Sequence, residues 1–282
     1  MSSRTSAFST LLRPEMHEIF FNKFSQYPKE YANVFTILNS NRAYEMDAEV
    51  TGLGPLVPKL EQTAITYDDP IQGLIKTYTH VPYALGFRVT HELYKDDQYN
   101  IIKRMPQALS RSAHQTMEVE HWKVFNNAFS AGSPGLDGQP LCSTIHPNVS
   151  GAGGPFSNQL ATAADLSITS LQSMIELMEN TTDDKDLNLM IRGKVLVIPV
   201  HLKWIARELL HSEFKPGTGD NEINSIKDED LSFMVSHYLS STSAWFLLAD
   251  KSEHYLRSFM RESLDFDNDD DFRKLESVHG NC

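Results

Sequence analysis

The stretch from residue 44 to residue 92 restricts how this chain can fold more than any other part of the sequence. Glycine and proline interrupt it repeatedly, and the short segments at 74–79 and 84–90 alternate β-branched or aromatic residues with polar ones. This alternation, bounded by turn residues, predicts strands. The stretch has little contiguous apolar sequence to bury, and an isolated two-stranded hairpin is only marginally stable in water. We therefore predict a long two-stranded excursion, with a reach of at most roughly 80 Å, that a partner chain supports.

The clearest predicted helix runs from residue 95 to residue 131, with Pro106 near its start and Gly132 after its end. Five apolar residues fall within about a 100° stripe of this helix: Leu109, Ala113, Met117, Val124 and Ala128. Such a stripe predicts a face that rests on a core, although Glu120 interrupts it. Trp122 and Phe129 point to the other side, so we expect the C-terminal half to contact two surfaces.

The remaining segments mix helices and strands without a regular rhythm. Before the hairpin, Pro14 is predicted to begin a short helix, because proline is favoured at the first helical position. Downstream of a Gly/Pro/Ser-rich connection we expect helices at Ile168–Glu179 and Lys203–Leu210, a loop at Phe214–Asn224, and strands at Lys194–Val200, Leu231–Leu239, Ala244–Ala249 and Tyr255–Phe266. This order argues against a parallel doubly wound sheet and predicts an α+β fold.

Charge and composition exclude several classes of protein. The chain has 25 Lys and Arg against 37 Asp and Glu, a net charge of −12, which argues against a protein whose main task is to grip nucleic acid. The charge still permits a protein that lies beside DNA. The longest nearly uncharged apolar runs, 195–202 and 240–249, fall short of the ~20 residues of a membrane span, so no membrane partner is expected. Cys142 and Cys282 form no disulfide framework; Cys142 is expected to be a small buried hydrophobe.

A search for catalytic or metal-binding patterns leaves two candidates, neither of which we assign. Glu118 and His121 share a helix face, but a second such pair is missing, so we expect them to be solvated or to face an interface. Asp265 to Glu276 matches several EF-hand ligand positions, yet Asp270 stands where the loop needs glycine. An acidic turn between two strands is the favoured interpretation, and cation binding there stays open. We therefore predict no catalytic, cofactor-binding or metal residues and no cofactor, which fits a structural subunit rather than an enzyme.

Several short motifs, in order along the chain, resemble one known family. Residues 137–147, Asp-Gly-Gln-Pro-Leu-Cys-Ser-Thr-Ile-His-Pro, resemble a signature of tailed-phage major capsid proteins, the Mu-like major head subunit family. Upstream, 86–90 and 93–97 resemble the end of that family's extended loop and the start of its spine helix, and 67–70 resembles the loop tip. Within the helix, 105–113 and 126–129 also match. The similarity runs over most of the chain and is strongest from about residue 66 to residue 160.

The resemblance implies the fold of tailed-phage major capsid proteins and a division of the chain into parts. The implied parts are an N-terminal arm at 1–43, an extended loop at 44–92, a peripheral domain with the spine helix at 93–158, an axial domain at 159–250, and returning peripheral strands at 251–282. Cys142 departs from the family, which usually has an aromatic or aliphatic residue there. The C-terminal end also looks shorter than is typical, so the last strand is expected to be abbreviated.

The function implied by the resemblance is that of a major capsid protein, whose copies form an icosahedral shell of hexamers and pentamers around the DNA genome. The extended loop is expected to lie over a neighbouring subunit, the arm to become ordered on assembly, and Phe214–Asn224 to lie at the capsomer centre. Expected partners are a separate scaffolding protein, the portal, other head proteins, and double-stranded DNA through non-specific proximity. The expected location is the virion capsid, and the host cytoplasm during assembly.

Three alternatives remain open at this point. The first is an encapsulin-like shell protein of a cellular nanocompartment, which resembles phage capsids in fold. The second is a minor head or tail component. The third is a metal-dependent enzyme or calcium-binding protein that uses Glu118 and His121, or the Asp265–Glu276 loop.

Overall fold

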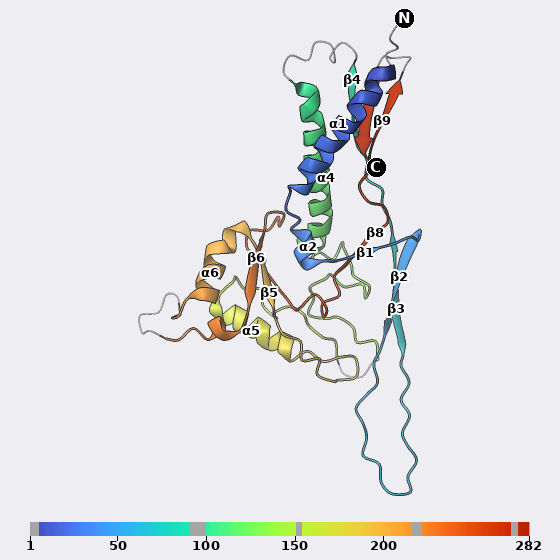
Figure 1. Cartoon of the computed structure of the whole chain (residues 1–282). Helices are drawn as coiled ribbons and strands as arrows, with labels where there is room; N and C mark the ends of the chain where they lie inside the picture. Colours follow the sequence, from blue (N-terminus) through green and yellow to red (C-terminus); the bar gives the residue numbers. More distant parts are fainter. Residues whose placement is uncertain (1–5, 91–99, 151–153, 216–221, 272–275, 282) are drawn as a thin grey trace, which may run out of the picture. The chain divides into compact units, whose positions relative to one another are not determined.

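The computed structural model describes residues 6–90, 100–150, 154–215, 222–271 and 276–281. The helices are α1 Ser6–Ser25, α2 Tyr31–Val34, α4 Ile101–Asn126, α5 Ile168–Glu179 and α6 Lys203–His211, with 3-10 turns η1 Val200–Leu202 and η2 Ser225–Asp228. The strands are β1 Thr36–Asn39, β2 Tyr44–Val50, β3 Gln72–Thr79, β4 Leu85–Thr90, β5 Val195–Pro199, β6 Ser232–Ser236, β7 Phe246–Leu248, β8 Arg257–Met260, β9 Phe266–Asp271 and β10 Glu276–Asn281. The α+β class is therefore confirmed (Figure 1).

The chain forms two compact units, each built from separate stretches of sequence. The first comprises Met1–Tyr44, Thr79–His121 and Arg257–Cys282, and the second comprises Glu45–Tyr78 and Trp122–Leu256.

The first unit has a core between α1, α4 and a three-stranded antiparallel sheet. Met16 and Phe20 of α1 pack with Ile102 and Leu109 of α4 and with Phe266 of β9. The sheet has the order β4-β10-β9, and β1 pairs with β8 in parallel, separately from it. Figure 1 shows α1 lying along α4.

The prediction that the first helix begins at Pro14 is wrong, because α1 begins at Ser6 and contains Pro14 in its interior. Residues 6–13 lack glycine and proline and include several good helix formers, so the helix can extend upstream of the proline. Downstream, the burial of Met16 and Phe20 holds the next turns against the core. These contacts offset the cost of the backbone hydrogen bond that proline cannot donate.

In the second unit, α5 and α6 pack with a mixed three-stranded sheet of order β6-β5-β7. β5 is central, parallel to β6 and antiparallel to β7, and it contributes the fully buried Leu196 and Ile198. Ser167 and Ser170 form a reciprocal capping box, and α5 begins at the residue after Ser167. The predicted helices at 168–179 and 203–210 are both confirmed.

Helix α4 is shorter than predicted and buries a different face along its length. It ends at Asn126, where the chain tightens into a turn in which the amide of Ala128 bonds the carbonyl of Phe125. Leu109 is buried as predicted, but Val124 is exposed and Trp122 is fully buried. At 100° per residue Trp122 lies about 140° around the helix from Leu109, so the buried face rotates from the first half to the second.

Near the C-terminus, the described acidic residues occupy a strand rather than a turn. Asp267 to Asp271 belong to β9, which pairs with β10 in antiparallel register, with Asp271 opposite Glu276. The connection at 272–275 lies outside the described residues. An EF-hand needs this segment as a flexible loop between helices, whereas here its backbone is held in a sheet ladder. The two antiparallel strands of the prediction are therefore present, with β9 extending through Asp271, and the predicted turn between them lies outside the described residues.

Candidate assembly surfaces

The hairpin of β2 and β3 presents apolar side chains that its own unit does not cover. Leu74 and Ile75 are consecutive residues of β3, so they point to opposite faces, and both are exposed. Beyond the strands, the hairpin continues as a long open loop (Figure 1), and Leu56 in this loop is 100% exposed. The exposed large apolar residues of the hairpin and its loop are Tyr44, Met46, Val50, Leu53, Leu56, Val57, Leu60, Ile65, Tyr67, Ile71, Leu74, Ile75 and Tyr78.

This concentration of exposed apolar residues is far above what isolated surface hydrophobes explain, and such surfaces mark sites of protein–protein interaction. The strands β3 and β4 lie close to their predicted positions, but the hairpin is shorter than the predicted excursion. β4 does not pair with β2 or β3; it pairs with β10 instead.

Polar contacts anchor the base of the hairpin loop. The amide of Thr51 donates to the carbonyl of Ile71 at 3.0 Å, and the amide of Ile71 donates to the Thr51 hydroxyl at 2.8 Å. Asp68 accepts from the amide of Gly54 at 2.8 Å and from Lys185 Nζ at 3.1 Å. These two interactions, the Gly54 hydrogen bond foremost, lower the pKa of Asp68 below its usual value.

The loop tip therefore lies elsewhere than the resemblance implied. Residues 67–70 were expected at the tip, but Asp68 is bonded to the opposite arm of the loop close to the strand ends. The chain instead reverses near Gln62, which has a positive φ of 65°, with the amide of Thr63 bonded to the carbonyl of Leu60. The interaction of Asp68 with Lys185 joins residues 117 positions apart, and no local sequence signal points to it.

In the first unit, Glu118 is a buried clamp rather than the solvated or interface-facing residue that we predicted. Its side chain is 0% exposed. Oε1 accepts from the amide of Glu30 at 2.7 Å, and Oε2 accepts from the amide of Tyr31 at 3.1 Å. A carboxylate at the start of α2 satisfies amides that a helix leaves without partners, which explains why a charged residue is buried here.

His121 is likewise committed to internal contacts. Its Nδ1 donates to the carbonyl of Met117 at 2.6 Å, and its Nε2 is hydrogen-bonded to the Ser258 hydroxyl at 2.7 Å. The ring stacks on Tyr31 with centroids 4.1 Å apart. Burial, followed by the Glu118 charge, raises the pKa of Tyr31. Glu118 and His121 thus both direct their polar atoms to partners within the chain.

The same contacts change the expectation for the N-terminal arm. We predicted that the arm becomes ordered through other chains, but α2 is bound to α4 through Glu118, and α1 packs on α4 through Met16 and Phe20. His114 adds a further link, because its Nε2 donates to the carbonyl of Pro28 at 2.9 Å. The described part of the arm from residue 14 onward is therefore held by its own chain.

The residues of the 137–147 signature form a closed turn in the second unit. Gly138 has a φ of +78°, a conformation that favours glycine. Asp137 accepts from the amide of Gln139 and contacts His146 Nδ1 at 2.5 Å. Burial alone raises the pKa of Asp137, but the hydrogen bonds from His146 and from the Gln139 amide outweigh it and lower the pKa. The pair therefore joins the two ends of the signature.

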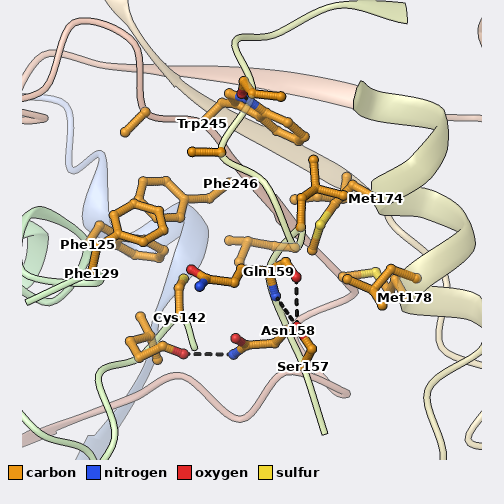
Figure 2. Close-up of a pocket in the computed structure, with 18 of the residues that line it drawn as sticks. Phe125, Phe129, Cys142, Ser157, Asn158, Gln159, Met174, Met178, Trp245 and Phe246 are labelled. Atoms are coloured by element: carbon orange, nitrogen blue, oxygen red, sulfur yellow. Dashed lines mark hydrogen bonds between the residues drawn. The ribbon is translucent and has the colours of Figure 1, made fainter. Parts of the chain in front are cut away.

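The second unit also contains a cavity of ≈ 720 Å³ that the sequence did not reveal. Figure 2 shows Met174 and Met178 on one side and the rings of Phe125 and Phe129 on the other, with Trp245 at one end. The polar lining is largely engaged: Asn158 donates to the carbonyl of Leu141 at 2.7 Å and accepts from the amide of Ser143 at 2.8 Å. The cavity is therefore mainly apolar in what it offers a ligand.

Cys142 lines this cavity, and burial raises its pKa from 9.0 to about 11. Because the thiolate is the reactive form, two pKa units lower its fraction roughly 100-fold at pH 8. In unassembled Cys282→Ser protein, iodoacetamide is expected to alkylate Cys142 about 100-fold more slowly than in the urea-unfolded chain. The rate should rise about tenfold per pH unit up to pH 10, as followed by intact mass spectrometry. Equal rates in the folded and unfolded chains would contradict the burial of this thiol.

The predicted loop at the capsomer centre is described only at its two ends, because 216–221 lie outside the described residues. Phe214 bridges Ile223, and both side chains are exposed. Lys215 Nζ pairs with Glu222 Oε2 at 2.9 Å. These contacts bring the two ends of the loop together.

Two further observations concern only the part of the chain that the structure describes. Within it, no three His, Cys, Asp or Glu side chains gather in an arrangement suited to a metal ion. No helix there combines the length and the apolar character that crossing a bilayer requires.

Comparisons with known proteins point to one group. The sequence profile of a family described as phage capsid protein matches residues 74–277. The capsid of bacteriophage JBD30 superimposes with a TM-score of 0.63 and 15% identity, covering 85% of this chain and 100% of that chain. The JBD30 capsid decorated with minor capsid protein trimers superimposes with a TM-score of 0.59 and 16% identity, covering 76% of this chain and 92% of that chain. The bacteriophage PhiM1 mature capsid superimposes with a TM-score of 0.58 and 8% identity, covering 91% of this chain and 82% of that chain. No curated protein matches by sequence.

Proposed function

Because this chain belongs to the phage capsid protein family, we propose that it is the major capsid protein of a tailed phage and that its copies close into an icosahedral shell around the genome. The fold shared with phage capsid chains supports this assignment. The observation within the chain that carries it is the hairpin and its loop, whose many exposed apolar residues need a cover that one chain does not supply. The protein acts as a structural component of the virion, and we assign it no enzymatic activity.

In this proposal the hairpin of each subunit lies across a neighbour in the same ring. Contacts that relate one surface to a different surface on the next copy produce rings when the rotation closes, and these rings are the hexamers and pentamers of the shell. The ends of the Phe214–Asn224 loop, with their exposed Phe214 and Ile223, lie toward the ring centre. We keep the division into arm, extended loop, peripheral domain and axial domain as part of this proposal.

The other partners follow from the same role. A separate scaffolding protein, the portal and further head proteins complete the particle, and assembly takes place in the host cytoplasm. The net charge of −12 lets packaged double-stranded DNA lie against the inner wall without tight binding, because like charges repel and counterions screen them. We place the chain in the Mu-like major head subunit family, on the strength of the 137–147 signature and its closed Asp137–His146 turn.

The alternatives have less support. The family profile and the matched structures are those of phage capsids, and no observation favours a nanocompartment shell. The metal-binding alternative has less support, since Glu118 and His121 bond to partners within the chain and Phe266–Asp271 of the second candidate form the strand β9.

Electron microscopy of the purified full chain tests the proposal. We expect closed particles with icosahedral symmetry, or open sheets of rings when the scaffolding protein is missing. A minor head or tail component would instead form one small ring. A compact monomer at every concentration, with a radius of gyration near ~19 Å, would contradict the proposal.

A further inference from the structure

The cavity of the second unit has walls suited to an apolar occupant. Its ≈ 720 Å³ correspond to roughly two dozen water molecules at about 30 Å³ each. Phe125, Met174 and Met178 contribute apolar surface, and neighbouring polar groups are already hydrogen-bonded within the chain (Figure 2). Water in such a space gains few hydrogen bonds, whereas apolar side chains gain the free energy of leaving water. Methionine side chains also adapt their shape to an incoming group.

The hairpin loop of the same chain carries an exposed apolar segment that could fill such a cavity on another copy. Pro55, Leu56, Val57 and Pro58 form an apolar segment in which Leu56 is 100% exposed. Each proline fixes its own φ, so the segment loses less conformational entropy on binding than a flexible loop would. Since Leu56 is fully exposed in this chain, its own loop does not fill the cavity. The available occupant of matching chemistry is the same segment on a second copy.

Charge supports the same pairing. Lys59 directly follows the apolar segment, and Asp165 lies on the lining of the cavity. Both are exposed, and within the described residues neither takes part in an ion pair. The segment and the cavity are thus both apolar, and the charged residues next to them, Lys59 and Asp165, have opposite signs.

We propose that the segment Pro55–Leu60 of one subunit inserts into the cavity between α5 and the Trp245–Leu248 segment of a neighbouring subunit, with Lys59 pairing with Asp165 at the rim. This proposal rests on the proposed function, because it names the place on the neighbour where the hairpin ends. It predicts contacts between Leu56 and the two methionines of α5, Met174 and Met178.

Photo-cross-linking locates the loop in assembled shells. Full-length protein carries a diazirine amino acid at position 56, and it is assembled with an equal amount of ¹⁵N-labelled unaltered protein. After irradiation, mass spectrometry of peptides is expected to find position 56 joined to the ¹⁵N peptide of α5 that carries Met174 and Met178. A diazirine at Gln62, in the turn of the loop, is the matched control and should give at least tenfold less of this product. Shells whose residue 56 links to another surface would overturn the insertion while leaving the proposed function intact.

A second variant tests the cavity without altering the loop. Ala163 is an exposed residue on the lining, so Ala163→Phe narrows the cavity without disturbing a core. We expect the threshold concentration for shell formation to rise at least tenfold. Thr162→Phe, at the exposed neighbouring residue that is outside the set of lining residues, is the control and should assemble as the unaltered chain does. An unchanged threshold for Ala163→Phe would contradict the proposal. So would native mass spectra that show a small apolar molecule retained by the subunit and by the shell.

Discussion

Replacing residues 52–70 with the turn Asn-Gly is expected to give a folded subunit that forms no shells. Thr51 and Ile71 are bonded to each other at the end of the strands, so a two-residue turn can close the hairpin at this point. The deleted residues contribute no buried side chain, which is why the fold should persist. Four side chains such as Leu53, Leu56, Val57 and Leu60 represent about 6–12 kcal/mol of gross apolar contact on a neighbour. Since about 1.4 kcal/mol is tenfold in an equilibrium constant, assembly should be lost at any practical concentration.

Circular dichroism and thermal unfolding report whether the shortened subunit folds, and light scattering with electron microscopy reports assembly. A full-length variant in which those four residues are changed to serine keeps the length of the loop but removes its apolar contacts, and it too should fail to assemble. The matched control is Glu61→Ala with Thr63→Ala, which alters polar residues of the same loop and should leave assembly intact. Normal shells from the shortened subunit would remove the central support of the proposed function.

Glu118→Ala is expected to destabilise the unassembled subunit by about 2–4 kcal/mol and to release α2 from α4. The substitution leaves the amides of Glu30 and Tyr31 without their acceptor, and an unsatisfied buried donor costs about 1–3 kcal/mol. Removing the carboxylate also removes the free-energy cost of burying its charge. We therefore expect a smaller loss of stability than breaking a fully buried ion pair would cause. Urea unfolding measures the free energy, and hydrogen exchange of the Tyr31 amide measures the release directly.

Gln115→Ala is the matched control, because Gln115 lies on the exposed side of the same helix. We expect it to change stability by less than about 0.5 kcal/mol and to leave the exchange of the Tyr31 amide unchanged. Glu118→Gln keeps the size of the side chain but only one accepting oxygen, so it should fall between the alanine variant and the unaltered chain. If Glu118→Ala exchanges the Tyr31 amide no faster than Gln115→Ala, the clamp does not hold α2.

Much of the local structure could be predicted from sequence because its causes lie within a few residues. The cap at Ser167 and the apolar spacing after it locate α5, and the continuous apolar run after Lys194 locates β5. The alternation in residues 74–79 and 84–90 locates β3 and β4. The scarcity of contiguous apolar sequence in the hairpin region led us to predict a partner chain there, and the exposed apolar residues of the hairpin are the structural observation behind the same proposal.

The errors share a different cause. Pro14 was taken as a helix start, yet contacts of Met16 and Phe20 with α4 and β9 carry the helix through it. Val124 was placed in the buried stripe, whereas the buried face of α4 rotates toward Trp122. Asp68 was placed at a loop tip, but it bonds to Lys185 across 117 positions. In each case a contact from a distant part of the sequence overrides the local pattern.

The amino-acid sequence by itself predicted the α+β class, the positions of α5, α6 and the strands β3 to β7, and a hairpin region with little contiguous apolar sequence. Periodicity, capping and turn residues act over one or two turns of chain, so they can be read directly from neighbouring letters. Only the tertiary structure decided that Glu118 is buried against Tyr31, 87 positions away, and that Phe125, Cys142 and Met178 line one cavity. The physical reason is that desolvation and packing depend on which surfaces meet, and that is a property of the folded chain as a whole.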